Sequence, residues 1–443
     1  MKKLITAFAV LLSLYSCNNK PAEKTYFTDA FSYSKTVKEL NEVVKFVGFA
    51  PIVASRNYAY ANIAAYECIA AGYPKEYNSL SGQINGFTID ESSFGFKDYQ
   101  IDYEFASLLA FCKVGEAVTF PEGSMKEYVD SLKNFAEESG MPSRMFANSV
   151  AFADSVSKTV LAWSKKDSYA QTRSASRYTV LDSPGRWVPT PPAYASALEP
   201  HWREIRSIVM DSCNQFMPPR PIPFNVTDKN GAYYKQVMAV KNAVDSLTDE
   251  EKHIAEFWDD LGGKLNVVGH IQFVTKKFSP PGHWMNIVGI ASQKAKASFR
   301  KTVAAYTLTS ICMFDGFIQC WDEKFRSNMV RPETVINKYI DQDWRPYLQT
   351  PPFPEYTCGH STVSSAAAEA LTKIYGDNFN YTDTSELEFG IANRSFTSFR
   401  QAAQENNMAR FYGGIHFHPS CIVSNEYGKK VGDFIVGKLK LEK

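Results

Sequence analysis

Apolar residues recur at the spacing of an α-helix over most of the chain, and this periodicity limits the possible fold more than any other feature. Residues three or four positions apart share one face of a helix, so a stripe at this spacing predicts a helix with one buried side. Two such stripes are Val37, Leu40, Val44, Val47 and, much later, Val363, Ala367, Leu371, Ile374. The alternation of apolar and polar residues that is typical of strands is scarce. The sequence therefore predicts a mainly α-helical protein.

No repeat, low-complexity tract or long linker divides the chain into separate units. Stretches rich in proline and glycine, at 183–192, 217–224 and 350–354, predict loops between helical blocks. The longest apolar helix is expected over 299–321. With 443 residues, 44% of them hydrophobic, the chain can bury a large core. We expect one large helical domain over 31–443.

The first residues have the pattern of an export signal. Lys2 and Lys3 precede an apolar run over 4–14, which is too short to cross a bilayer that needs about 20 residues. The run ends in Leu14-Tyr15-Ser16-Cys17, which resembles the lipobox of bacterial lipoproteins, where the cysteine is lipidated and becomes the new N-terminus. The alternative is ordinary cleavage that leaves Cys17 unmodified.

This leader predicts where the protein resides. We expect a signal peptide over 1–16 and a lipidated linker over 17–30, in a lipoprotein of the bacterial cell envelope, in the periplasm or at the outer membrane. The lipid anchor would be the only membrane attachment, because no other segment is expected to span a membrane. Export would also place the seven remaining cysteines where disulfides form, and their odd number leaves at least one unpaired.

Charge limits the possible partners. The chain has 48 Lys and Arg residues against 47 Asp and Glu residues, and no run of basic residues stands out. Nucleic-acid binding depends on concentrated positive charge, so no nucleic-acid partner is expected. Any anion must therefore be bound by a local cluster of cations. The sequence predicts no particular oligomeric state.

Three short segments carry the residues with the clearest chemical meaning. They are Lys324-Phe-Arg-Ser-Asn-Met-Val-Arg331-Pro332, Pro354-Glu-Tyr-Thr-Cys358-Gly359-His360-Ser361 and Ala409-Arg410-Phe-Tyr-Gly-Gly414-Ile-His416. Their order and internal spacing resemble the vanadium-dependent haloperoxidase and type 2 phosphatidic acid phosphatase superfamily, in its bacterial haloperoxidase-like branch. The resemblance covers about 250–437. It implies an all-α fold of two helical bundles in one large domain, with the site in the C-terminal bundle.

A tetrahedral oxyanion such as phosphate or vanadate requires fixed N–H donors and positive charge. Lys324, Arg331 and Arg410 can supply both, because arginine offers a rigid fork and lysine a movable point charge. Gly359 follows Cys358 at the start of a predicted helix, whose first N–H groups can bind an anion. The alternative for the three cations is that each forms a surface salt bridge. The resemblance assigns all of these residues to oxyanion binding.

The resemblance gives the two motif histidines different roles. His416 matches the residue that ligates vanadium axially in haloperoxidases and attacks phosphorus in the phosphatases. His360 matches the acid–base histidine of both chemistries. Phe353 falls where the family has an aromatic residue beside the halide or substrate pocket, although ordinary core packing would also explain it. The implied cofactor is vanadate, or phosphate in the same site.

Two positions depart from the family pattern. Cys358 stands where the family usually has a serine, and a thiol is the poorer hydrogen-bond donor. Four residues after His416 the family has an aspartate, and here Ser420 stands instead, or Ser424 if a short insertion is assumed. We therefore expect the carboxylate that orients the histidine to be missing, a loss that costs about 10–100-fold in metal sites. We also expect that Cys358 and Cys421 could form a disulfide beside the site.

Several other residues have competing interpretations. Asp315 lies within the long apolar helix and is expected either to pair with a site cation such as Arg410 or to reach solvent. His416 and His418 could contribute to a zinc site, but no acidic third ligand lies nearby in sequence, and the cationic motifs would repel a divalent ion. The outer wall of the site, or a loop, is the expected place of Asp259, Asp260, His283 and Trp284.

The resemblance implies a vanadate-dependent haloperoxidase-like enzyme, in which vanadate assists the oxidation of a halide by peroxide. An acid phosphatase that forms a phosphohistidine is the alternative, because the same cationic pocket serves both reactions. A second alternative is a lipoprotein that binds an oxyanion without catalysis, since the serine and the aspartate are both replaced. All three take a small-molecule ligand.

Overall fold

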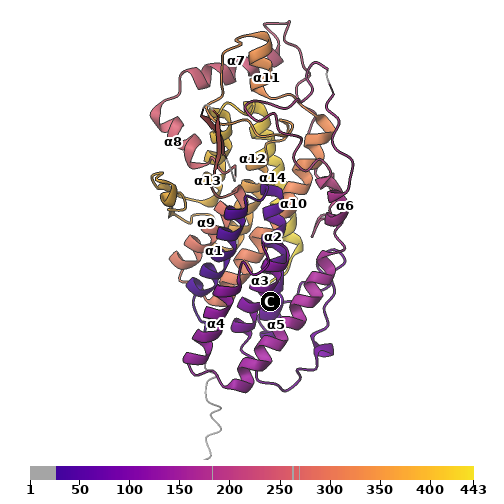
Figure 1. Ribbon diagram of the computed structural model, residues 1–443, viewed down its shortest axis with the longest axis vertical. Helices are drawn as coiled ribbons and strands as arrows, with labels where there is room; N and C mark the ends of the chain where they lie inside the picture. The colour runs from indigo at the N-terminus through magenta and orange to yellow at the C-terminus, as the bar shows by residue number, and fades with distance from the viewer. Residues whose placement is uncertain (1–25, 182, 262–263, 269) are drawn as a thin grey trace, which may run out of the picture.

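The computed structural model describes residues 26–443 except 182, 262, 263 and 269. The leader and Cys17 lie outside the described residues, so the export signal and the lipid anchor stay predictions. The prediction of an all-α protein is confirmed, because helices form nearly all of the regular structure (Figure 1).

The N-terminal part is a bundle of helices in which α2 is the central member. The helices are α1 (Ala30–Val47), α2 (Pro51–Gly72), α3 (Tyr103–Ala117), α4 (Lys126–Glu138) and α5 (Ser143–Ser164). The first predicted stripe forms the buried side of α1, where Val37, Leu40 and Val44 are buried. α2 is buried around almost its whole circumference and packs against α3, α5 and α10.

The C-terminal part is built around α10. Its helices are α9 (Pro280–Lys294), α10 (Phe299–Ser327), α12 (Gly359–Tyr375), α13 (Phe399–Tyr412) and α14 (His418–Lys438). α10 packs against α2 on one side and α12 and α14 on the other, so it connects the two bundles. It extends six residues beyond the predicted end, to an asparagine cap with φ of 50° at Asn328.

The expectation that no segment after the leader could span a membrane needs correction for α10. This helix is long and apolar enough by length and composition. Its most apolar window is, however, entirely buried inside the protein. The apolar character of α10 is explained by its central position between the two bundles.

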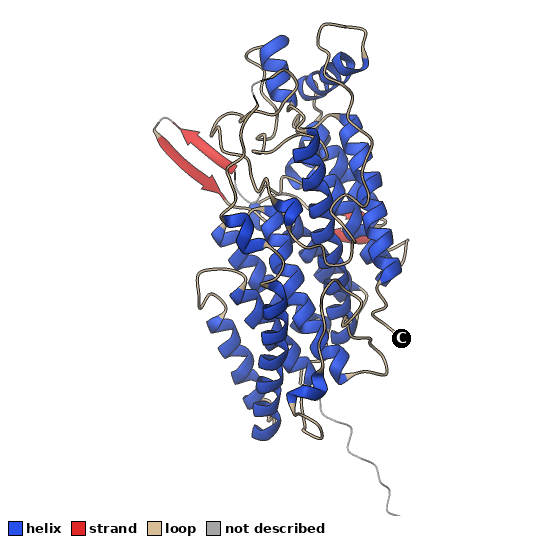
Figure 2. Cartoon of the chain, turned by 90° about the vertical axis from the view of Figure 1, so that its right-hand side faces the viewer, coloured by secondary structure: helices blue, strands red, loops and turns tan. Residues whose placement is uncertain are grey.

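Shorter elements lie between and around the long helices of both bundles. They are α6 (Tyr169–Arg173), α7 (Ala232–Asp245), α8 (Asp249–Phe257), α11 (Pro332–Tyr339) and the 3-10 turns Glu91–Phe94, Trp202–Glu204 and Leu387–Phe389. Two antiparallel hairpins pair β1 (Lys264–Val268) with β2 (Ile271–Thr275) and β3 (Tyr381–Asp383) with β4 (Arg394–Phe396). The β1–β2 hairpin projects from the body of the molecule (Figure 2). The predicted proline-rich and glycine-rich segments are loops.

Close contact between α12 and α14 depends on two glycines of α14. A Cβ atom at Gly428 would lie 2.2 Å from the carbonyl oxygen of Thr362, and one at Gly432 would lie 2.9 Å from Cβ of Glu369. Only glycine allows the two backbones to approach this closely. This contact matters for the site because α12 begins at Gly359 and α14 begins directly after Phe417.

Asp315 has neither of the two predicted environments. Its carboxylate is completely buried and accepts hydrogen bonds from the backbone N–H groups of Ile208, Val209 and Met210, at 2.7 to 2.9 Å. Burial raises the pKa of Asp315 to about 6 although the three N–H donors favour the charged form. Asp315 therefore anchors a loop against the middle of α10 and does not pair with Arg410.

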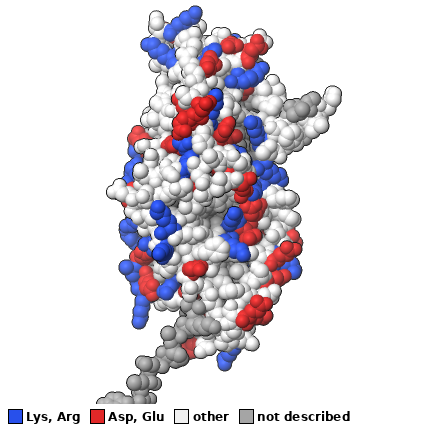
Figure 3. Space-filling view, turned by 90° about the vertical axis from the view of Figure 1, so that its left-hand side faces the viewer, with Lys and Arg blue, Asp and Glu red and all other residues white. Residues whose placement is uncertain are grey.

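On the face drawn in Figure 3, basic and acidic side chains are interspersed, with no extended basic region. This distribution agrees with the near-neutral composition.

Candidate active site

The three sequence motifs meet at one pocket of the C-terminal bundle. Gly359, His360, Arg410 and His416 line it together with Phe353, and its remaining wall is mostly apolar, with Phe317, Trp321 and several prolines. Lys324 and Arg331 lie directly beneath this surface, completely buried. The structure thus brings all the predicted oxyanion-binding residues together at one place.

Helix ends and turns position these side chains. Lys324 is in the last turn of α10, Arg331 caps α11, Cys358 caps α12 and Arg410 is in the last turn of α13. After α13 the chain reverses at Gly414, whose φ is 75°. A Cβ atom there would lie 2.8 Å from Val244, so glycine is required both by conformation and by space. This reversal returns His416 to the pocket.

Lys324 is held by two backbone carbonyl groups. Its Nζ donates to the carbonyl oxygens of Pro354 and Glu355, at 2.8 and 3.1 Å, and lies 4.9 Å from the centre of the Phe353 ring. Burial lowers the pKa of Lys324 to about 8. A nearby anion would favour its charged form.

Arg331 and Arg410 both keep a donor free for a ligand. Arg331 donates from Nε to the carbonyl oxygen of Phe353 and from Nη1 to that of Ile415, both at 2.8 Å. Arg410 donates from Nη1 to the carbonyl oxygen of Trp258 at 2.9 Å. Nη2 of Arg331 and Nε of Arg410 are buried without a hydrogen-bond partner. Among the described residues neither arginine has a carboxylate within ion-pair distance, so the surface salt-bridge alternative does not apply to them.

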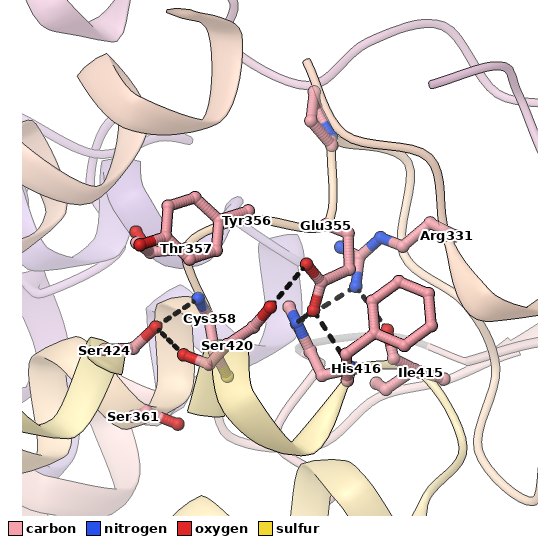
Figure 4. Close-up of polar contacts among 12 residues, drawn as sticks. Arg331, Glu355, Tyr356, Thr357, Cys358, Ser361, Ile415, His416, Ser420 and Ser424 are labelled. Carbon is pink, nitrogen blue, oxygen red and sulfur yellow. Dashed lines mark hydrogen bonds and ion pairs between the residues drawn. The ribbon is translucent and has the colours of Figure 1, made fainter. Parts of the chain in front are cut away.

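His416 has a carboxylate partner, contrary to the expectation that this group is missing. Nδ1 of His416 lies 2.8 Å from Oε1 of Glu355 (Figure 4). Ser420, which occupies the expected aspartate position, donates to the other carboxylate oxygen at 2.9 Å, and the backbone N–H of Phe417 donates to Oε1 at 3.0 Å. Glu355 is completely buried. The carboxylate therefore comes from the second motif, and the serine in the third motif holds it in place.

This contact also fixes which nitrogen of His416 is available. If Glu355 accepts the Nδ1 proton, Nε2 carries the lone pair, and in this structure that lone pair accepts a hydrogen bond from Nη1 of Arg331 at 3.0 Å. A neutral imidazole with a directed Nε2 lone pair is what axial ligation or nucleophilic attack requires. The sequence contained the signal, because Glu355 lies within a quoted motif three residues before Cys358.

His360 occupies the first turn of α12 and faces the same pocket. Its Nε2 is buried without a hydrogen-bond partner. Burial lowers the pKa of His360 well below its usual value, and the positive charge of Arg410 lowers it further. His360 is therefore a neutral side chain at neutral pH, with one ring nitrogen left for a ligand or a proton.

Phe353 lies between the cations and the open pocket. Its ring centre lies 5.0 Å from that of Trp321 and 5.0 Å from the guanidinium carbon of Arg331. It lines the pocket and is 8% exposed. Both predicted positions of Phe353 therefore apply, because the same ring packs in the core and lines the pocket.

Cys358 and Cys421 are free thiols in this structure, so the predicted disulfide is not present. Cys421 and His416 both lie beside the Cys358 thiol. The backbone N–H of Cys358 donates to Oγ of Ser424 at 2.7 Å. Ser424 thus holds the residue that caps α12.

The zinc interpretation of His416 and His418 finds no support in the described part of the chain. His418 packs edge-on against Phe411, with ring centres 5.2 Å apart. The described residues that could surround a metal ion lie elsewhere, and they are Asp260, His283 and Glu386, all buried.

This acidic cluster already contains a cation. His283 lies between carboxylates of Asp260 and Asp383, at 3.1 and 2.9 Å. Burial would lower the pKa of His283, but the two aspartates raise it well above its usual value. A protonated His283 therefore balances the acidic charge. The expectation of an outer wall or a loop is confirmed for Asp259 and Asp260, which lie in the loop after α8. It is wrong for His283 and Trp284, which are completely buried in α9.

The donor set fits a tetrahedral oxyanion. Three buried polar atoms without partners, Nη2 of Arg331, Nε of Arg410 and Nε2 of His360, belong to residues that meet at this pocket. Unpaired buried polar groups are costly and are normally satisfied by a partner. An anion bound beside His416 and the N-terminus of α12 would supply that partner.

Comparisons with known proteins agree with the site geometry. Residues 304–441 match a family model described as the VCPO second helical-bundle domain. A solved bacterial vanadium-dependent iodoperoxidase is 41% identical, with a TM-score of 0.85, over 93% of this chain and 97% of that chain. A holo-type bacterial vanadium-dependent chloroperoxidase is 17% identical, with a TM-score of 0.66, over 88% of this chain and 92% of that chain, and shows the fold alone. No curated protein sequence matches the chain.

Proposed function

The chain belongs to the vanadium-dependent haloperoxidase family, and from this premise we propose that it is an enzyme that uses bound vanadate to oxidise a halide with hydrogen peroxide. The observation that carries the proposal is the pairing of His416 with Glu355 beside the unsatisfied donors of Arg331, Arg410 and His360. This arrangement offers one directed imidazole nitrogen and several fixed donors to the same anion.

Each residue would have a separate task. Arg331, Arg410 and Lys324 would bind oxygens of the oxyanion and balance its charge. Gly359 would donate its backbone N–H from the start of α12, where no side chain blocks the approach. His416 would hold the centre of the anion through Nε2, with Glu355 fixing the tautomer.

Bound vanadate would supply the activation of peroxide, and the protein would manage the protons. His360 is neutral and faces the pocket, so it can accept a proton from peroxide and return it to a leaving oxygen. The apolar wall, which includes Phe317, Trp321 and Phe353, would limit the access of water to these groups.

We propose iodide as the halide. The support is the similarity to the bacterial vanadium-dependent iodoperoxidase, which covers nearly the whole chain. Phe353 and Trp321 would form the side of the pocket from which the halide approaches.

We also propose that the protein is anchored in the bacterial cell envelope through a lipid on Cys17. The support is the lipobox-like segment that ends at this cysteine. Substitution Cys17→Ala should move the protein from the membrane fraction to the aqueous fraction of lysed cells. Equal partitioning of the two proteins would contradict the anchor.

The activity proposal is tested by removing and restoring the cofactor. The purified protein is treated with a chelator, and peroxide-dependent iodide oxidation is measured before and after vanadate is added back. We expect loss and recovery of activity in the wild type, and no recovery in Arg331→Met. Arg326→Met is the matched control, because Arg326 is in the last turn of α10 and pairs with Glu323 outside the site.

Two other results would change the assignment. Hydrolysis of a phosphate ester that vanadate inhibits would identify the phosphatase reaction instead. Vanadate binding without turnover of either substrate would indicate an oxyanion-binding protein.

A further inference from the structure

We propose that Asp260, His283 and Glu386 bind a divalent transition-metal ion, such as Zn²⁺ or Mn²⁺, at a buried site that is separate from the oxyanion pocket. The three side chains are completely buried, and one ligand atom of each lies within 4.8 Å of the others. The proposal goes beyond the proposed function, because the ion would take no part in the oxidation of a halide.

Glu386 is the side chain that points to a missing ligand. It is completely buried, and neither carboxylate oxygen has a hydrogen-bond partner among the described residues. Oε1 lies 3.8 Å from Nδ1 of His283, and Oε2 lies 3.6 Å from Nζ of Lys277, so both contacts are too long for hydrogen bonds. A buried carboxylate without a donor is costly, and a cation placed between Glu386 and its neighbours would satisfy it.

The ligand atoms lie at distances that suit one ion. Nδ1 of His283 is 3.1 Å from each carboxylate oxygen of Asp260. An ion that binds nitrogen and oxygen ligands at about 2.0–2.2 Å separates neighbouring ligand atoms by about 3.0–3.5 Å. The distances to Asp260 fall in this range, and a small movement of the Glu386 side chain would bring its oxygen into the range as well.

Asp383 holds His283 in the orientation that a metal ligand needs. Nε2 of His283 lies 2.9 Å from Oδ2 of Asp383, and the other oxygen of Asp383 accepts from the backbone N–H of Ser385 at 2.9 Å. When Nε2 donates its proton to Asp383, Nδ1 can direct its lone pair toward Asp260 and Glu386. A histidine ligand that donates its second N–H group to a carboxylate is the usual arrangement around protein-bound metals.

The charges of the cluster also favour a divalent ion. Asp260, Asp383 and Glu386 carry three negative charges, and a protonated His283 together with Lys277 supplies two positive ones. One negative charge therefore stays uncompensated in the interior. A divalent ion that displaces the Nδ1 proton to solvent would make the cluster neutral.

The mixture of one imidazole and two carboxylates limits the type of ion. Ca²⁺ takes oxygen ligands, and Mg²⁺ usually keeps several waters, which a completely buried site does not offer. Zn²⁺ accepts histidine nitrogen together with carboxylate oxygen, and Mn²⁺ accepts carboxylates readily. Asp260 and Glu386 offer two oxygens each, so the protein alone can complete a four-coordinate ion.

The ion would connect three distant segments beside the oxyanion pocket. Asp260 follows α8, His283 belongs to α9, and Glu386 follows β3. The ring of His283 stacks on that of Trp258, with centres 4.7 Å apart, and the carbonyl oxygen of Trp258 accepts from Arg410. We therefore expect a structural ion that stabilises the part of the protein behind Arg410.

Calorimetric titration tests the site. The purified full-length protein is freed of metal with a chelator and titrated separately with Zn²⁺ and Mn²⁺, without phosphate or vanadate. We expect saturable binding of at least one of the two ions at one site per chain, and a higher melting temperature in its presence. Asp383→Asn should weaken binding by about 10–100-fold, and Glu386→Gln, which removes a ligand, by more.

Glu388→Gln is the matched control. Glu388 lies two residues from Glu386 but forms its ion pair with Lys45 outside the cluster, so this variant should bind the ion like the wild type. The anomalous scattering of Zn²⁺ or Mn²⁺ in crystals of the wild type locates the ion without any variant, and we expect it about 2.0–2.2 Å from Nδ1 of His283.

Three results would overturn the proposal. They are no saturable binding of either ion by the wild type, an unchanged affinity in folded Glu386→Gln, or an ion that crystals place away from His283. Vanadate binding and iodide oxidation are measured on separate samples, so a failure of the proposed function would leave these results unaffected.

Discussion

At the scale of single residues, the account depends on Glu355. This carboxylate accepts from His416, Ser420 and the backbone N–H of Phe417, and it is completely buried. In the family pattern, an aspartate four residues after the histidine orients the imidazole. Here Glu355, from the second motif, orients it instead. The serine at the expected aspartate position therefore does not leave the histidine without a partner.

Substitution Glu355→Gln should weaken vanadate binding by about 10–100-fold, because an amide orients the imidazole less strongly and does not raise its basicity. Calorimetric titration with vanadate measures this effect. Ser420→Ala is the control, since it removes one hydrogen bond to Glu355 but leaves the carboxylate against His416, and its effect should be smaller. Equal affinities in Glu355→Gln and wild type would show that the contact does not support the ligand.

Lys324 should make vanadate binding depend on pH. Its pKa is lowered to about 8 by burial, so its positive charge is present below that pH and is lost as the pH rises through it. Affinity should therefore fall above about pH 8 in the wild type. Lys324→Arg keeps its charge over the same range, and changes in the vanadate ion itself affect both proteins equally. Parallel pH profiles of the two proteins would contradict this assignment.

The cations and both histidines of the site could be predicted because they lie at fixed spacings within short motifs, which can be read from one sequence. Sequence analysis missed Glu355 because the distance between the loop before α12 and the loop before α14 is set by tertiary packing. It also misplaced His283, which is buried in α9 against Asp383 of β3, far along the chain.

At the scale of elements, the long helices follow from periodicity, and their ends follow from local conformation. The apolar pattern predicts that α10 ends near 321, but the helix continues to Ser327. Residues 322–324 are polar and therefore do not extend the apolar stripe, although the fold buries them. The two hairpins are short, and no clear alternation of apolar and polar residues in the sequence predicts them. Packing against the neighbouring elements therefore decided both features.

Asp315 anchors the loop at residues 208–210 to α10, so Asp315→Asn should lower the free energy of unfolding by about 3 kcal/mol or more. An asparagine turns an N–H group toward backbone donors that need an acceptor. Chemical denaturation measures the change, and vanadate affinity should stay near that of the wild type. Glu426→Gln is the control, because its pair with Lys430 is exposed and should contribute about 1 kcal/mol or less.

At the scale of the whole molecule, α10 joins the two bundles and carries Lys324 at its end. The pocket is formed where the ends of α10, α12 and α13 meet the loop before α14, with Pro51 of the N-terminal bundle in its wall. The site therefore requires the assembled fold. The three short motifs could predict the polar residues of the pocket but not the residues that form the rest of its lining.

The central claim is that His416, oriented by Glu355, holds vanadate in this pocket. Calorimetric titration of vanadate into wild type and His416→Ala tests it most directly. We predict saturable binding at one site per chain in the wild type and at least about tenfold weaker binding in His416→Ala, with the same far-ultraviolet circular dichroism in both. Equal affinities in the two folded proteins, or no vanadate binding by the wild type, would contradict the claim.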